Sequence, residues 1–161
     1  MRKGMIPLVA IAYCTGSLAL LWAANNVPVP GSCTPSVNQK LANLLSSNPS
    51  GPVDNVMVCG TTTAPSQTQF GGPHGNHQIL PIRAVLPDHS TRLLEVVTND
   101  SLDGKVTAPV NAQVFAYGQA FFSHTAPYAA GVHDVHCSTH TGADNGWVVV
   151  KGTKYPKTCQ Y

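Results

Sequence analysis

The sequence predicts a mainly β protein, a single disulfide-bonded sandwich or barrel-like domain with one short N-terminal helix. From His77 onward, branched apolar residues recur in short segments separated by turn residues, which is typical of strands. Only residues 36–45 show helical spacing. An even set of four cysteines outside the N-terminal apolar run predicts two disulfides in a secreted chain. The lack of alternating helix and strand signals favours a sandwich or barrel.

The N-terminus has the pattern of a secretory signal. Arg2 and Lys3 precede an uncharged, mostly apolar run over residues 5–24, and a basic start followed by such a run is typical of a signal peptide. We expect cleavage after Ala23, so that residues 1–23 are removed and the mature protein is extracellular or periplasmic, with no membrane contact. The alternative is an uncleaved anchor, since about 20 apolar residues can span a bilayer.

Residues 24–35 contain three prolines and are expected to form an extended leader before one domain over residues 36–161. Within that domain, residues 36–45 predict the helix, because Val37, Leu41 and Leu44 share one helical face. The Pro- and Ser-rich residues 46–52 end it.

The following strands are predicted from alternation and turn residues. Residues 55–59 form a short strand and residues 61–69 a polar surface loop. Residues 78–86 and 91–98 form two strands, joined by a hairpin-type turn at residues 87–90.

The last third of the chain continues this pattern. Asp103 and Gly104 mark a turn, and residues 111–122 fit strand or helix, with alternation favouring a strand. Residues 147–155 predict a closing strand pair around Lys151 and Gly152, with Trp147 in the core. Residues 142–146 predict a hairpin turn with positive φ at the Asp-Asn-Gly sequence.

Cys33, Cys59, Cys137 and Cys159 allow three connectivities. We favour Cys33–Cys59 and Cys137–Cys159 because each closes a short local loop. A thiolate metal site is disfavoured, since no C-x-x-C spacing occurs and secreted thiols usually oxidise.

The charge balance disfavours strong nucleic-acid binding. Without Arg2 and Lys3, the 138-residue mature chain has seven Lys or Arg and seven Asp or Glu, whereas phosphate-backbone binding usually needs a basic patch. Lys151, Lys154 and Lys157 lie close in sequence, and we interpret them as a solvated edge.

Histidines form the strongest functional signal. His74 and His77 are three residues apart, as are His133 and His136. Two such pairs could bind a divalent metal such as Zn²⁺, with Asp134 or Asp144 as a ligand or as an acceptor for a ring N–H.

A second interpretation needs no metal. His77 and His136 could act as base and acid on a phosphodiester, with Asp134 or Asp144 setting a tautomer. Lys151 or Arg83 would then stabilise developing charge, and Asn145 would contact the substrate. In a regular strand His133 and His136 would point to opposite faces, so only one need face a cleft. The remaining alternative is structural, with local hydrogen bonds only. His89 and His124 are interpreted as surface residues.

Several segments occur in an order that resembles the YukJ-like family of uncharacterised bacterial domains, over roughly residues 70–152. They are Val114-Phe115-Ala116-Tyr117-Gly118, Gly131-Val132-His133-Asp134-Val135-His136, Asp144-Asn145-Gly146-Trp147 and His77-Gln78-Ile79. Residues 137–140 depart from the Met-Asn-Gln-Gly run of that family. The resemblance implies a shared fold and a shared histidine site, without a reaction.

The sequence as a whole indicates a small secreted hydrolase, acting on a phosphodiester through His77, His133 and His136 with Asp134. The alternative is a secreted metal- or ligand-binding module without turnover. Both interpretations require that the three histidines approach one another in the fold, with Asp134 or Asn145 nearby.

Overall fold

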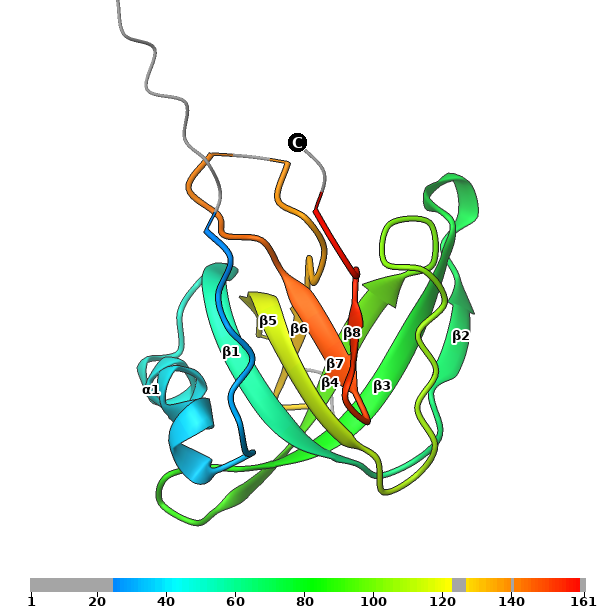
Figure 1. Cartoon of the computed structure of the whole chain (residues 1–161). Helices are drawn as coiled ribbons and strands as arrows, with labels where there is room; N and C mark the ends of the chain where they lie inside the picture. The colour runs from blue at the N-terminus through cyan, green and yellow to red at the C-terminus, as the bar shows by residue number, and fades with distance from the viewer. Residues whose placement is uncertain (1–24, 123–126, 140, 160–161) are drawn as a thin grey trace, which may run out of the picture.

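The computed structural model describes residues 25–122, 127–139 and 141–159, so the predicted signal peptide and His124 lie outside the described residues. Eight strands form one sheet in the order β1-β3-β4-β6-β5-β7-β8, with β2 paired to β3. Because β1 also pairs with β5, the strands β1-β3-β4-β6-β5 close into a five-stranded barrel (Figure 1). The bounds are β1 Val53–Thr62, β2 Gln67–Phe70, β3 Asn76–Val85, β4 Thr91–Asn99, β5 Gln113–Phe121, β6 Ala130–His133, β7 Trp147–Val150 and β8 Thr153–Tyr155.

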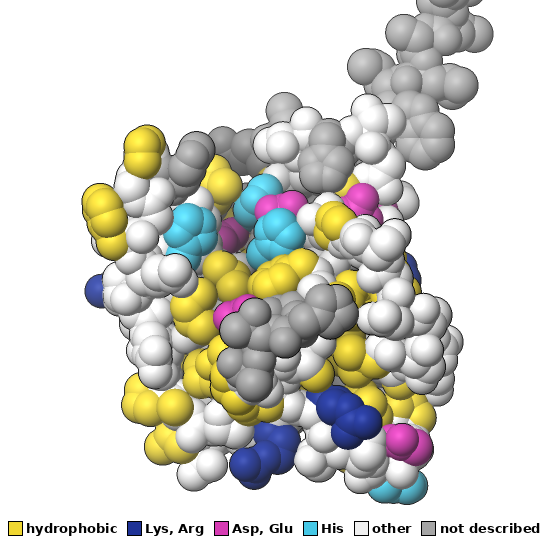
Figure 2. Space-filling model, turned by 180° about the vertical axis from the view of Figure 1, so that it is seen from behind, with side chains coloured by type: hydrophobic (Ala, Val, Ile, Leu, Met, Phe, Trp, Pro, Cys, Tyr) yellow, Lys and Arg dark blue, Asp and Glu magenta, His cyan; other side chains and the backbone are white. Residues whose placement is uncertain are grey.

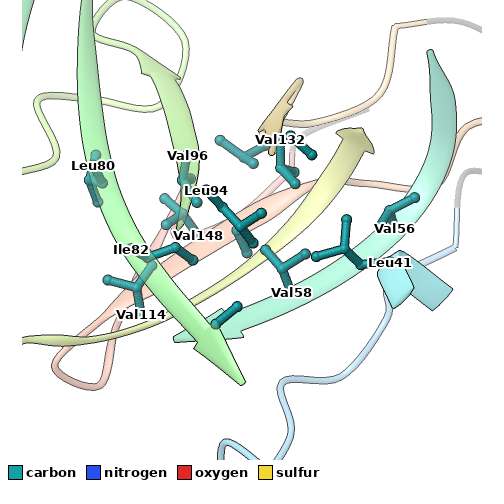
Figure 3. Close-up of a cluster of buried hydrophobic side chains, with 14 of the residues drawn as sticks. Leu41, Val56, Val58, Leu80, Ile82, Leu94, Val96, Val114, Val132 and Val148 are labelled. Atoms are coloured by element: carbon teal, nitrogen blue, oxygen red, sulfur yellow. The ribbon is translucent and has the colours of Figure 1, made fainter. Parts of the chain in front are cut away.

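The barrel interior holds the main hydrophobic core. Side chains alternate between the inside and the outside along each strand, so that Val56 and Val58, for example, point inward from β1. Figure 3 shows these inward side chains meeting between the strands. Leu94, Val96 and Val132 bring β4 and β6 into the same core, which fixes the parallel pairing of these two strands.

A short helical segment covers one opening of the core. It begins with the 3₁₀ turn η1 (Pro35–Asn38) and continues as α1 (Gln39–Ser47), ending at Asn48 in the left-handed conformation. Leu41 is fully buried in the core. The buried Asn38 amide donates to the Cys59 and Val85 carbonyls and accepts from the Cys59 N–H, which ties the helix to two strands.

The described part of the leader packs on the outer face of β1, β5 and β7 (Figure 1). There Cys59, Phe115, Tyr117, Trp147 and Val149 form a second cluster, covered by Val27, Cys33 and Val37. The Trp147 Nε1–H donates to the Val27 carbonyl at 2.8 Å. Residues 25–37 are therefore part of the folded domain, because they pack on the outer face of the barrel.

Both favoured disulfides are confirmed, Cys33–Cys59 and Cys137–Cys159. Within the described residues, none of the helices is long and apolar enough to cross a membrane. The two disulfides are compatible with a secreted protein.

The mainly β fold, the single short α-helix and the strand pairs around residues 87–90 and 151–152 are confirmed. The loop predicted at residues 61–69 is wrong, because β1 extends to Thr62 and Gln67–Phe70 pair with β3. The hairpin predicted at residues 142–146 is also wrong. Positive φ occurs at Gly142, whereas Asn145 forms an isolated parallel β-bridge with Asn26.

Candidate functional site

A cavity of about 450 Å³ opens on the outer face of the barrel, where the start of β3, the ends of β4 and β5, and β6 meet. Figure 2 shows histidine side chains gathered around this hollow, with acidic side chains between them. The described residues that line the cavity are His77, Val97, Asn99, Leu102, Asp103, Phe121, His133, Asp134 and His136. All three histidines that were expected to converge therefore lie on one cavity.

A sharp turn brings His133 and His136 to the same side. His133 ends β6, and Asp134 adopts the left-handed conformation with φ 51°, which Asp tolerates better than most residues. Val135 then points into the core and is fully buried. Strand alternation alone would have placed the two histidines on opposite faces, so the turn at Asp134 is what joins them in one site.

Two glycines of neighbouring segments hold this turn. A Cβ at Gly118 of β5 would overlap the His133 carbonyl oxygen, and a Cβ at Gly146 would overlap the Asp134 carbonyl oxygen. The Gly146 N–H donates to the His136 carbonyl at 2.7 Å. The backbone of residues 133–136 is thus packed between β5 and the segment that precedes β7, which leaves little freedom to the side chains that it carries.

Asp134 joins the two histidines electrostatically. Its Oδ1 lies 3.2 Å from His133 Nδ1 and 3.5 Å from His136 Nε2. Two hydrogen bonds hold the pKa of the Asp134 carboxyl well below its usual range despite partial burial. The hydrogen bond from His133 has the larger effect, and the one from His136 the next. Asp134 is therefore ionised at neutral pH.

His136 is held as a cation. Its Nε2 faces the Asp134 carboxylate, and its Nδ1 lies 3.0 Å from the Cys137 carbonyl oxygen. Both partners are acceptors only, so both ring nitrogens must carry protons to bond them. The hydrogen bond to Asp134 accordingly raises the pKa of His136 to about 8, against the opposing effect of burial. This geometry favours His136 as the counterion of Asp134 over the acid of an acid–base pair.

His133 is placed differently. Its Nδ1–H donates to Asp134, which leaves Nε2 as the unprotonated nitrogen of the neutral ring. Among the described residues, His133 Nε2 has no hydrogen-bond partner, and the side chain is 37% exposed at the cavity. The ring of Phe121 packs edge-on against it, with 5.2 Å between ring centroids. His133 is therefore the histidine whose free nitrogen can act on a ligand.

His77 also lines the cavity, from the start of β3. Asn99 Oδ1 accepts the Ser101 N–H at 2.9 Å, which turns the Asn99 amide nitrogen toward His77 Nε2 at 3.4 Å. His77 Nε2 is therefore an acceptor, and its proton sits on Nδ1. The ring also packs against Gly71, where a Cβ would not fit. These contacts favour a positioning role for His77.

Asp103 is the site residue that sequence reasoning missed. The Asp-Gly pair at residues 103–104 reads as an ordinary turn, and only the tertiary structure places the carboxyl group in the cavity wall. Asp103 is 5% exposed, its Oδ2 accepts the Asn99 N–H at 2.6 Å, and its Oδ1 is buried without a hydrogen-bond partner among the described residues. Burial raises the pKa of this carboxyl to about 6.

Four other predicted residues lie away from the cavity. Asn145 is buried and bonds Asn26 and the Ser138 N–H, so it braces two loops. Lys151 is exposed in the β7–β8 turn, and Arg83 is exposed on β3. Asp144 accepts from the Tyr117 hydroxyl at 2.7 Å and from Asn25.

The expected metal set of His74, His77, His133 and His136 stays a prediction. His74 ends the 3₁₀ turn η2 (Gly72–His74), and its side chain lies outside the described part of the structure. Among the described residues, no group of three or more His, Cys, Asp or Glu side chains is arranged to hold a metal ion.

Comparison of the chain with protein-family models, curated proteins and solved structures gives no match. The resemblance to the YukJ-like family therefore stays a prediction, and the functional argument rests on the cavity.

Proposed function

We propose that the protein is a small secreted hydrolase in which His133 is the general base. The observation that carries this proposal is the pairing of His133 Nδ1 with the ionised Asp134 at 3.2 Å, which fixes the tautomer and leaves Nε2 free at the cavity. A histidine oriented in this way by a carboxylate is the usual device for moving one proton in acyl or phosphoryl transfer.

One histidine suffices for the proton balance. Nε2 of His133 takes a proton from a water molecule while the water oxygen forms its bond to the scissile centre. The imidazolium that results is stabilised by Asp134, which stays ionised because His136 holds it. When the scissile bond breaks, the leaving oxygen, on the side opposite the attacking water, takes a proton from solvent, and His133 releases its proton to solvent, so the site is restored.

The phosphodiester expected from the sequence remains the proposed substrate bond. The cation of His136 supports it through charge alone, because both of its ring N–H groups already face Asp134 and the Cys137 carbonyl. The described lining contains no Lys or Arg, so hydrolysis of a phosphodiester would depend on His136 for charge.

The test compares bis(p-nitrophenyl) phosphate with p-nitrophenyl acetate, each with and without EDTA. We expect diester hydrolysis that EDTA leaves unchanged, and a loss of about 10²–10⁴-fold in rate for His133→Gln. His89→Gln is the matched control, because His89 lies exposed in the β3–β4 turn. Full activity in His133→Gln contradicts the proposed base, and loss of activity in EDTA favours the metal interpretation.

A secreted ligand-binding module without turnover is the second candidate. The apolar part of the lining, Val97, Leu102 and Phe121, favours it, since such surface binds a ligand without any proton transfer. Saturable binding of a ligand without hydrolysis of any ester or diester in the same screen would select this function.

A further inference from the structure

The carboxylates of the cavity are not equally compensated. Asp134 has two imidazole partners, one of which is a cation. Asp103 accepts only the Asn99 N–H, on Oδ2, and has the His136 cation near it without a hydrogen bond, while its Oδ1 is buried with no hydrogen-bond partner among the described residues. No Lys or Arg lies in the described lining. Besides Nε2 of His133, the acceptor that the described lining leaves without a donor is Asp103 Oδ1.

The turn that carries Asp103 is held in place. The Asp103 N–H donates to the Asn99 carbonyl at 2.8 Å, and the neighbouring Asp100 carboxylate accepts the Gln78 amide at 2.9 and 3.0 Å. Asp103 thus cannot readily swing out to water, and a buried acceptor without a donor is costly. A ligand that supplies a charged N–H donor relieves this cost.

The remaining wall is apolar. Val97 and Phe121 line the cavity, and Leu102 stands at its edge with 55% of its surface exposed. Such a wall suits a hydrocarbon group, whereas a hydrated metal ion prefers several oxygen or nitrogen ligands. Among the described residues no such set of three occurs. An organic cation fits both parts of the cavity.

We propose that the cavity binds an organic ammonium group, which the Asp103 carboxylate recognises while an adjoining hydrocarbon group packs on Leu102, Val97 and Phe121. The inference rests on the proposed function in one respect, namely that this ammonium group belongs to the substrate. The substrate class is then an ester or diester that carries a primary ammonium beside its scissile bond.

Three probes of one ring size test the charge preference: benzylammonium, benzyl alcohol and benzyl phosphate. Each is titrated into the mature protein, with the histidine ring C–H signals followed by NMR. We expect benzylammonium to bind at least about tenfold more tightly than benzyl alcohol, which is the effect of one charge-assisted hydrogen bond. Benzyl phosphate is expected to bind least.

Two variants test whether Asp103 causes the preference for ammonium over alcohol. Asp103→Asn keeps the acceptor for the Asn99 N–H and is expected to lose the preference for ammonium over alcohol. Asp100→Asn removes a carboxylate of the same turn that does not line the cavity. This variant is expected to keep the preference for ammonium over alcohol. Persistence of the preference in Asp103→Asn overturns the proposal. If Asp103→Asn does not fold, the wild-type probe series decides by itself.

The remaining outcomes are equally decisive. Equal binding of the alcohol, tighter binding of the phosphate, or a response to Zn²⁺ that EDTA reverses while benzylammonium has no effect would each overturn the inference. Failure of the hydrolase is a separate result: benzylammonium binding without hydrolysis of any substrate keeps the ammonium site and removes the proposed reaction. His133→Gln is expected to keep benzylammonium binding while it loses hydrolysis.

Discussion

Two outer faces of the barrel differ in their side chains and in whether another segment covers them. On β1, β5 and β7 the outward side chains are large and apolar, and residues 25–37 cover them, fastened by the Cys33–Cys59 disulfide. On the face formed by the start of β3, the ends of β4 and β5, and β6, the side chains around an open cavity include three histidines and two aspartates.

The two faces differ in what holds their side chains in place. The covered face is stabilised by burial of apolar area, which is non-directional and tolerates changes in detail. The open face is organised by hydrogen bonds to Asp134 and by the close approach of Gly118 and Gly146. Substitutions on the covered face should therefore change stability alone, whereas those on the open face should also change function.

The largest expected effect is on the covered face. Trp147 is 1% exposed and stacks on Tyr117, so Trp147→Ala should lower the free energy of unfolding by about 3–5 kcal/mol. Leu102→Ala, on the open face, should change it by less than about 0.5 kcal/mol, because Leu102 is largely exposed. Urea denaturation measures both. A loss from Leu102→Ala as large as that from Trp147→Ala would refute the distinction.

The two disulfides should separate stability from function. They close loops of similar length, with sequence separations of 26 and 22 residues, so replacing either pair by serine should cost about 3 kcal/mol. Only the Cys137/Cys159→Ser pair should also slow hydrolysis under conditions where the protein stays folded, because the Cys137 carbonyl holds His136. Equal loss of activity in both pairs would show that the covered face also shapes the site.

Gly146 tests the packing of the turn. Gly146→Ala places a Cβ against the Asp134 carbonyl oxygen and should cost about 1–3 kcal/mol, with a loss of hydrolysis as Asp134 moves. Gly51→Ala is the matched control, since a Cβ there meets no atom within 4 Å. Stability from thermal unfolding and rates from the diester assay are compared. An active, fully stable Gly146→Ala would mean that the turn is not held by this contact.

The smallest expected effect is a pH dependence of stability from His136. Its pKa is raised from 6.5 to about 8 in the folded protein, so its contribution is fully present below pH 6.5 and is lost as pH rises through 8. The contribution is at most about 2 kcal/mol. Urea denaturation at pH 6.5 and 9 should show a decline in the wild type that His136→Gln largely removes and His89→Gln leaves intact. The same decline in both variants would assign it to other groups.

Much of the fold could be predicted from local sequence. The strands at residues 78–86 and 91–98, the turn between them and the pair around Lys151 and Gly152 all follow from alternation and turn residues, because register and side-chain facing repeat every two residues. The disulfide pairs followed from short sequence separation. The histidines that reach the cavity stood out because they occur in close pairs in a chain that is only 10% charged.

The composition of the cavity could not be predicted in the same way. Asp103 gave only a turn signal, and its burial depends on β4 and the 99–104 turn packing beside β6, which is a contact between segments distant in sequence. The opposite roles of His133 and His136 likewise depend on a single left-handed residue and on two glycines elsewhere in the chain. Sequence by itself determined the strand pattern, the covalent pairing and the histidine content of the site. Tertiary structure decided which nitrogen faces the cavity and which carboxylate is buried without a donor, because the turn at Asp134 and the burial of Asp103 are set by packing against segments distant in sequence.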